Sequence, residues 1–297
     1  MSEARQLDKL RVRRGFSRAA AAYDQAAFLA REVSERMSER LDLLRAVPKS
    51  ALDLGSGTGQ GGRMLRRRYP ECVVVELDSA HAMLVRSYRA IPWWQRSILR
   101  ARGGTAPLVC GDIEQLPFAD RTFDMVWSNL ALHWLDLRRA LAEIYRVLRP
   151  GGVCMFSTLG PDTLQELRSS YAAVDAYVHV NRFVDLHDIG DMLVEAHFAD
   201  PVMDMEYLRL TYADVRSLLH ELRATGARNA NAGRPRGLSG KRAFERMEAA
   251  YEKYRVEGRL PATFEVVYGH AWRPEIERRL PGGEAVIEFH PRRARAL

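Results

Sequence analysis

Apolar residues recur at helical spacing over the first part of this 297-residue chain and fall into short, separate runs after it. The helical spacing covers residues 3–45, and Pro48 then ends the segment because proline cannot continue a helix. Beyond residue 50, short apolar runs alternate with amphipathic stretches, which predicts a doubly wound, mostly parallel sheet. Strands are expected at 51–54, 72–78, 106–113, 123–130 and 153–158, with helices around 64–68, at 81–88 and at 137–148.

This alternation breaks down after residue 158. Helices are expected at 161–177, 186–198, 214–229 and 241–255, and two further strands at 201–212 and 263–273. The whole pattern predicts an α/β, Rossmann-like fold with a seven-stranded, mostly parallel sheet. Its expected parts are N-terminal helices at 1–50, a main domain at 51–273 with helical lid insertions at about 161–185 and 213–258, and a poorly ordered tail at 274–297.

The composition narrows the class of protein. The three cysteines, Cys72, Cys110 and Cys154, lie in or beside apolar runs, which favours reduced core thiols over a disulfide framework or a zinc site. No apolar run is long enough to span a membrane, and the charged first residues lack the apolar core of a secretory signal, so a cytoplasmic protein is expected. The net charge of +7 is explained equally well by an acidic partner and by a solvated basic surface.

A glycine-rich turn follows the first predicted strand in the segment from Asp53 to Gly59. Its Gly55, Ser56, Gly57 and Gly59 would let a ligand approach the backbone closely where the next helix starts. Such a turn alone is a weak signal, because nicotinamide and flavin enzymes also use one. Asp53 could hold a cationic amino group, directly or through water, and the residues after Gly59 depart from the dinucleotide-binding spacing.

Polar residues also stand at the carboxyl ends of the next strands. Asp78 ends the second strand, where a carboxylate can accept both ribose hydroxyls; the alternative is a cap for the following helix. Asp112 could accept from an adenine amino group with Ile113 against the ring, the alternative being a turn residue. Asn129, at the end of the fourth strand, is assigned to the same cofactor site.

Together these segments resemble the class I S-adenosylmethionine-dependent methyltransferases. The matching motifs, in order, are DLGSGTG, VELDSAHAML, GDIEQLPF, FDMVWSNLALHW and LRPGG, within residues 51–158. The resemblance implies that the cofactor is S-adenosyl-L-methionine, with its methyl group pointing into a cleft above the fourth strand.

The flanking segments resemble a narrower family, the malonyl-carrier-protein O-methyltransferases of biotin synthesis. The segments that carry this resemblance are FSRAAAAYDQAA, FSTLGPDTLQELR, NRFVDLHDIGDML, LRATGARN and GRLPATFEVVYGHAW. The resemblance implies methylation of the free carboxylate of a malonyl thioester, on either acyl carrier protein or coenzyme A. The ester hides a charge, so that fatty-acid enzymes accept the chain as a primer.

The chemistry of such a substrate sets what the site must supply. A carboxylate with a pKa of roughly 4 is already ionised at neutral pH and needs no general base. The site must instead provide a cation to hold it and exclude water. Arg182 is our candidate for that cation; the alternative is a surface salt bridge. Tyr23 is the candidate for capping the methyl site, the alternative being a packed helix tyrosine. His133 is the candidate for a role in the cleft, the alternative being a structural hydrogen bond.

Further side chains are expected to shape the cleft or the surface around it. Trp134 is expected to form a wall, and Asp24 to order the N-terminal helix. Arg223 and Arg228 either face the substrate or lie on a solvated surface. Because acyl carrier proteins are acidic as a class, basic helices could steer one to the enzyme, with Arg236, Lys241 and Arg242 as the candidate contacts.

Three rival functions remain to be compared. A nucleic-acid methyltransferase is disfavoured because Ser128 to Ala131 contain no proline, whereas base-amine methylases carry an Asn/Asp-Pro-Pro-aromatic motif there. A methyltransferase for another small carboxylate or for a quinone ring is possible, with His133 as the base that C-methylation needs. A respiratory-complex assembly factor that hydroxylates arginine shares the STLGPDTL segment. No membrane or nucleic-acid partner is expected, and the oligomeric state cannot be read from the sequence.

Overall fold

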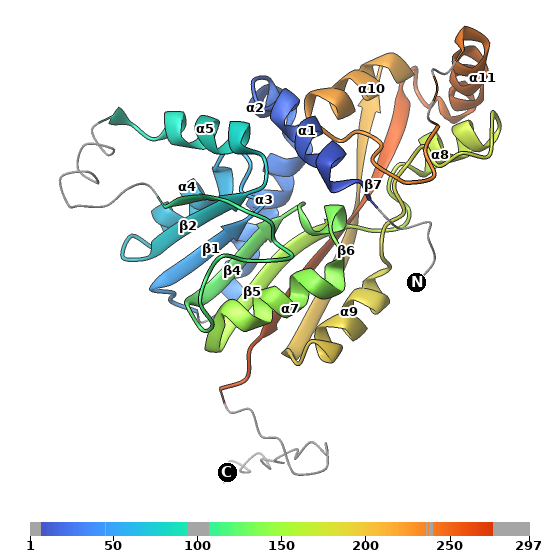
Figure 1. Ribbon diagram of the computed structural model, residues 1–297. Coiled ribbons are helices and arrows are strands. Elements are labelled where there is room, and N and C mark those ends of the chain that lie inside the picture. Colours follow the sequence, from blue (N-terminus) through green and yellow to red (C-terminus); the bar gives the residue numbers. More distant parts are fainter. Residues whose placement is uncertain (1–6, 45, 94–106, 236, 238–239, 276–297) are drawn as a thin grey trace, which may run out of the picture.

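A computed structural model describes residues 7–44, 46–93, 107–235, 237 and 240–275 of the chain (Figure 1). Within these residues one seven-stranded sheet has the order β3-β2-β1-β4-β5-β7-β6. Strands β1 to β5 pair in parallel, and β7 runs antiparallel to both of its neighbours. The predicted seven-stranded, mostly parallel α/β fold is therefore confirmed. The strands are β1 (Ser50–Leu54), β2 (Val73–Asp78), β3 (Leu108–Cys110), β4 (Phe123–Asn129), β5 (Leu148–Leu159), β6 (Ala199–Tyr212) and β7 (Leu260–Trp272).

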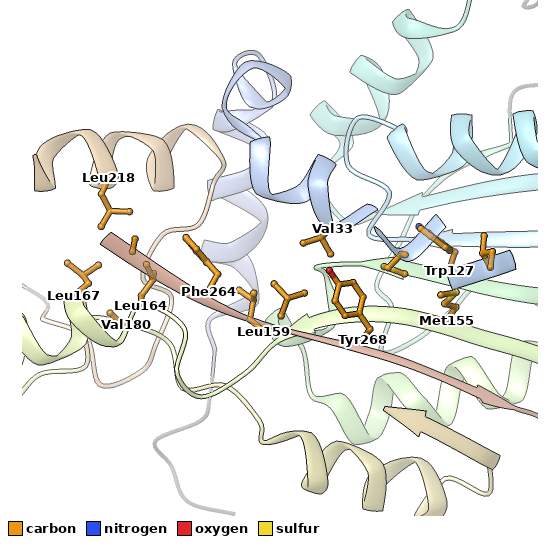
Figure 2. Close-up of a cluster of buried hydrophobic side chains, with 14 of the residues drawn as sticks. Val33, Trp127, Met155, Leu159, Leu164, Leu167, Val180, Leu218, Phe264 and Tyr268 are labelled. Atoms are coloured by element: carbon orange, nitrogen blue, oxygen red, sulfur yellow. The ribbon is translucent and has the colours of Figure 1, made fainter. Parts of the chain in front are cut away.

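Burial along the strands explains the apolar runs of the sequence. The central strands β1, β4 and β5 are buried almost throughout because helices cover both faces of a parallel sheet. Strand β6 lies at the edge and alternates between more and less exposed positions. On one face Trp127, Met155 and Tyr268 pack with Val33 of α3, as Figure 2 shows. The other face holds a second cluster that includes Leu52 and residues of α7.

Three helices follow β1, β2 and β4: α4 (Gln60–Arg68), α5 (His81–Ala90) and α7 (Leu137–Val147). A capping residue and a buried stripe explain why the sequence of α7 forms a helix. Asp136 caps its first turn by accepting a hydrogen bond from the backbone N–H of Arg139. Its buried residues recur three and four positions apart, so one stripe faces the sheet.

The N-terminal residues form three helices instead of the continuous helical segment predicted for 3–45. These are α1 (Lys9–Ala19), α2 (Tyr23–Ala26) and α3 (Phe28–Arg40), followed by the short 3-10 helix η2 (Leu41–Leu43). Leu44 is already extended, so the helical segment ends before Pro48. Figure 1 shows α1 and α2 between α5 and α10, and α1 contacts both of those helices.

The four helices expected after residue 158 are shorter than predicted. They are α8 (Gln165–Ala172), α9 (Leu186–Glu195), α10 (Val215–Ala224) and α11 (Lys241–Tyr251), of which α9 lies outside the predicted lid insertions. The 3-10 helices η3 (Leu132–Trp134) and η4 (Glu252–Tyr254) follow β4 and α11. Helix α8 starts late because Leu164 is in a left-handed conformation with a φ of 54°. Helix α10 ends early because Gly226, also left-handed, terminates it. Strand β3 likewise covers only part of 106–113.

Two further expectations concern the chain as a whole. None of the described helices is both long enough and apolar enough to cross a bilayer. Cys72, Cys110 and Cys154 are all free thiols; Cys72 and Cys154 are buried as predicted, whereas Cys110, also expected in the core, is exposed at the end of β3. The predicted tail at 274–297 falls almost entirely outside the described residues, as does Arg236.

Candidate functional site

The glycine turn, residues 55–59, joins β1 to α4 at the carboxyl edge of the sheet. Gly55, Gly57 and Gly59 all have positive φ angles, of 66°, 55° and 80°, which L side chains rarely adopt. The backbone N–H groups of Gly55 and Ser56 donate to the carbonyl of Leu77 in the neighbouring strand. A Cβ atom on Gly55 would lie 2.3 Å from the Cβ of Ala131, so the turn packs tightly against the segment after β4.

Asp78, at the end of β2, holds this turn in place. One carboxylate oxygen accepts from the N–H of Gly57 at 2.9 Å and the other from the N–H of Ala80 at 2.7 Å. Burial raises the pKa of Asp78, while these two hydrogen bonds oppose the shift. Each oxygen keeps a further lone pair, so the predicted role toward ribose hydroxyls is compatible with this geometry. Asp78 does not act as the N-cap of α5; that position is Ala80.

Asp53 lies beneath the turn. Its side chain is 2% exposed and does not line a cavity. A Cβ atom on Gly61 of α4 would come within 2.8 Å of Asp53 Oδ2 and 2.9 Å of the Nε1 of Trp127, and neither of these polar atoms has a hydrogen-bond partner among the described residues. Burial, and next the charge of Glu76, raise the pKa of Asp53 to about 8. Direct contact between Asp53 and a ligand amino group is not supported by this placement.

A cavity of about 430 Å³, the turn cavity, opens above the glycine turn. Gly55, Gly57, Asp78, Asp112, Ile113 and Asn129, all predicted cofactor residues, line it together with side chains of α1. Ser56 and Gly59 support the turn without lining the cavity. The structure thus brings six of the nine predicted cofactor residues to one hollow.

Asp112 and Asn129 already have protein partners there. Lys9 of α1 donates to Asp112 at 2.7 Å and also pairs with Glu114 at 2.6 Å, which lowers the pKa of Asp112 against the effect of its burial. Asn129 donates to the carbonyl of Ala30 and accepts from Ser157 Oγ, both at 2.8 Å. Asn129 therefore links α3 to β4 and β5, and Lys9 links α1 to Asp112 in the wall of the turn cavity.

A second cavity of about 390 Å³, the lid cavity, lies beside the first. Its wall is largely apolar and comes from α2, α3, α8, α10 and β7. Four residues line both cavities and form the boundary between them; we call them the boundary residues, Phe16, Tyr23, Leu130 and Trp134. The rings of Phe16 and Trp134 meet edge to face at 5.5 Å. Trp134 is thus a wall, as expected.

Tyr23 is the polar member of the boundary. Burial, and then the negative charges of Asp78 and Asp24, raise its pKa to about 12, so the phenol stays protonated. Asp24 accepts a hydrogen bond from Thr58 Oγ1 at 2.5 Å, which ties α2 to the glycine turn. The expected position of Tyr23 at the junction of the cofactor and substrate sites is compatible with this arrangement.

His133 lines the lid cavity next to the boundary, against the rings of Trp134 and Phe183. Burial lowers its pKa to about 3, because the charged imidazolium would lie in an apolar environment. Its Nδ1 has no hydrogen-bond partner among the described residues. His133 is therefore a neutral ring with very little affinity for a proton.

Arg182 is exposed and does not line the lid cavity, although its neighbours Asn181 and Phe183 do. The arginines that line the lid cavity are Arg11, Arg223 and Arg228, and none of the three forms an ion pair with another described residue. The N–H of Arg228 donates to the carbonyl of Gly226, and Gly226 lies directly against Phe16. The backbone of Arg228 thus lies next to the contact between Gly226 and the boundary residue Phe16.

Comparisons with known proteins agree with this architecture. Residues 52–156 match the family model described as a methyltransferase domain. A malonyl-[acyl-carrier protein] O-methyltransferase from Laribacter hongkongensis is 55% identical over 98% of this chain and 99% of its own length. Relatives of the same name from Gallionella capsiferriformans and Coxiella burnetii are 55% and 42% identical over 95% and 91% of this chain, and over 96% and 90% of their own lengths.

Solved structures share the fold at low identity. The YcgJ protein from Bacillus subtilis has a TM-score of 0.54 at 15% identity and covers 80% of this chain and 98% of its own. A phosphoethanolamine N-methyltransferase from Haemonchus contortus, solved in complex with S-adenosyl-L-methionine, has a TM-score of 0.50 at 16% identity and covers 87% and 57%. The near-complete match to the curated relatives, together with the glycine turn and its adjoining cavities, shows that the chain is a methyltransferase of the malonyl-[acyl-carrier protein] O-methyltransferase family.

Proposed function

We propose that this methyltransferase uses S-adenosyl-L-methionine to esterify the free carboxylate of a malonyl thioester, carried by acyl carrier protein or coenzyme A. One observation carries the proposal: the titratable side chains at and beside the boundary, Tyr23 and His133, cannot take up a proton near neutral pH. A hydroxyl or amine nucleophile must lose a proton during methylation, whereas a carboxylate arrives ionised.

The pKa values of these two side chains argue against base catalysis at the boundary. His133, with a pKa of about 3, is neutral but too weak a base to hold a proton removed from a substrate. Tyr23, with a pKa of about 12, stays protonated and therefore does not act as a base, although its hydroxyl can form hydrogen bonds. His179, the other histidine of the lid cavity, is hydrogen-bonded to Asp175 and stacks on Tyr171. This arrangement also argues against His133 as the base for quinone C-methylation.

The turn cavity fits the proposed cofactor. Side chains at Gly55 and Gly57 would occupy space beside the turn and strain it, so the bare backbone leaves room for a nucleoside. Asp78 offers carboxylate oxygens to ribose, and Asp112, Ile113 and Asn129 line the remaining wall. Asp53 supports this site from beneath the turn, and any contact with the amino group runs through water. The bound cofactor supplies a methyl group on a positively charged sulfur.

The transfer needs no proton. A carboxylate oxygen forms a bond to the methyl carbon while the carbon–sulfur bond breaks, and its electron pair stays on sulfur. One negative and one positive charge disappear together, so an environment of low polarity favours the step. The apolar boundary side chains Phe16, Leu130 and Trp134 provide that environment and exclude water.

The substrate carboxylate also needs a cation to orient it. Arg228 lines the lid cavity, lies next to the Gly226–Phe16 contact and has no ion-pair partner among the described residues. Its planar guanidinium can hold one carboxylate oxygen and leave the other to react. We therefore assign this role to Arg228 in place of the predicted Arg182.

The names of the relatives support the same substrate and disfavour the rival functions, the arginine-hydroxylating assembly factor included. Because the methyl ester masks the malonyl charge, the product suits an enzyme system that elongates uncharged acyl chains, and we assign it to the start of the pimeloyl chain of biotin. Three free thiols are consistent with a reducing compartment, the cytoplasm.

Intact-mass spectrometry of malonyl-carrier protein tests the proposal. Incubation with enzyme and S-adenosyl-L-methionine should add one CH2 to the malonyl form, and the product should lose its titratable carboxylate. Acetyl-carrier protein, which lacks the carboxylate, is the matched control and should remain unchanged. No mass gain on the malonyl form, or an equal gain on the acetyl form, would overturn the proposal.

A further inference from the structure

Helix α1 carries an unusual concentration of positive charge. Its sequence, KLRVRRGFSRA, contains five basic residues and no acidic one. Arg11, Arg14 and Arg18 are spaced by three and four residues, which places them on one stripe of the helix. Like charges at this spacing repel and destabilise an isolated helix, so the stripe is costly without a negatively charged partner.

The described residues do not neutralise this stripe. Arg11, Arg14 and Arg18 are exposed, and none forms an ion pair with another described side chain. Lys9 differs, because it is already paired with Asp112 and Glu114. Arginines elsewhere on the surface are commonly paired, as Arg40 is with Asp204 and Arg146 with Asp120 and Glu143. The stripe is therefore available to an external anion.

The stripe also leads to the active-site cleft. Arg11 lines the lid cavity, whereas Arg14 and Arg18 line neither cavity and continue along the exposed side of α1. Gly15 packs α1 against the turn after α10, where a Cβ atom would approach the carbonyl oxygen of Gly226 to 3.0 Å. A partner lying along α1 would thus have one end beside Arg11 and the lid cavity that this residue lines.

Helix α11, which contains the Lys241 and Arg242 expected to steer a carrier, fits this role less well. It balances three basic residues with Glu245 and Glu248, and Lys241 is 3.7 Å from Glu245. Among the described residues, no side chain of α11 lines either cavity. Its net positive charge is therefore smaller than that of α1, and it does not border either cavity.

We propose that the arginine stripe of α1 is the docking surface for a small, acidic carrier protein, which presents its acyl group to the lid cavity on a flexible arm. The inference rests on the proposed function and specifies the partner's surface chemistry. Complementary charge increases the rate of encounter and sets the orientation of the partner, while the lid cavity discriminates the acyl group. The affinity should accordingly fall steeply as salt is added.

The test uses Arg14→Glu/Arg18→Glu, which reverses two charges that line neither cavity. Arg67→Glu/Arg139→Glu, at exposed positions on α4 and α7, is the control with the same change in net charge. Calorimetry at low salt measures the Kd for unloaded carrier protein bearing its arm. The α1 variant should bind about tenfold more weakly, and the control within about twofold of the wild type. Both should keep their affinity for S-adenosylhomocysteine, which reports the folded cofactor site.

An unchanged Kd in the α1 variant would overturn the proposed surface. An equal loss of affinity for the carrier protein in the control, or in Lys241→Glu/Arg242→Glu, would do the same. The two proposals can fail separately. Methyl transfer to malonyl-carrier protein that is insensitive to Arg14→Glu/Arg18→Glu refutes docking on α1 alone. Carrier binding through α1 without any methyl transfer refutes the proposed function alone.

Discussion

Replacing Gly55 by alanine tests whether the glycine turn shapes the cofactor site. The residue has a φ of 66°, and the added methyl group would lie 2.3 Å from the Cβ of Ala131, against a normal carbon–carbon contact of about 3.5–4.0 Å. The left-handed conformation costs a non-glycine residue about 1–2 kcal/mol, and the overlap costs about 1–3 kcal/mol more as the chain shifts. We therefore expect Gly55→Ala to lower the free energy of unfolding by about 2–5 kcal/mol.

Urea denaturation measures this loss, and calorimetry with S-adenosylhomocysteine measures its effect on the turn cavity. Because Gly55 lines that cavity, the affinity should fall more than about tenfold even where the variant is fully folded. Gly190, inside α9 with no atom within 4 Å of its Cβ position, is the matched control. Gly190→Ala should stabilise the protein by about 0.5–1 kcal/mol and leave binding unchanged. Wild-type stability and affinity in Gly55→Ala would refute the reasoning.

Three further predictions address the cleft. In steady-state kinetics, Arg228→Ala should raise the KM for a malonyl thioester about tenfold, whereas Arg182→Ala should leave this KM within about twofold of the wild type. The reverse pattern would identify Arg182 as the residue that holds the carboxylate. Lys9→Met removes the charge paired with Asp112 and Glu114, which holds α1 beside the turn cavity. Stopped-flow measurements should therefore show S-adenosylhomocysteine dissociating about two to five times faster. An unchanged dissociation rate would contradict the idea that α1 retains the cofactor. The pKa of His133, about 3 in the folded protein, lies below its ordinary 6.5, so the unfolded chain binds the proton first and stability falls as pH decreases between these values. Urea titrations should show His133→Gln losing about 1 kcal/mol less per pH unit there than the wild type, and parallel losses would contradict the buried, neutral ring.

The parts of the fold that local patterns determine could be predicted from the sequence. The short apolar runs of β1 and β4 are buried because helices cover both faces of the sheet, and the three glycines at 55–59 predict the turn. The residues at which helices begin and end were harder to predict from the sequence. Leu164 adopts a left-handed conformation without being glycine or asparagine, so nothing in its residue type indicates the late start of α8.

Placement of the site residues depended on contacts between distant segments. Asp53 has the expected sequence position, yet its side chain packs under Gly61 beside Trp127, 74 residues further on. Asp112 meets Lys9, which is 103 residues away. Arg182 was the predicted cation, and the sequence left open whether Arg228 faces the substrate or solvent; only the path of the chain over the sheet brings Arg228 to the cavity wall. No local pattern distinguishes such residues.

The central claim is that methyl transfer at this site uses a nucleophile that is ionised before it binds. Its most direct test is the pH dependence of the single-turnover rate with a malonyl thioester between about pH 6 and 9. Because neither Tyr23 nor His133 changes its charge in this range, the rate should be level within about twofold. A rate that rises tenfold per pH unit and then levels off near neutral pH would reveal a general base and contradict the account.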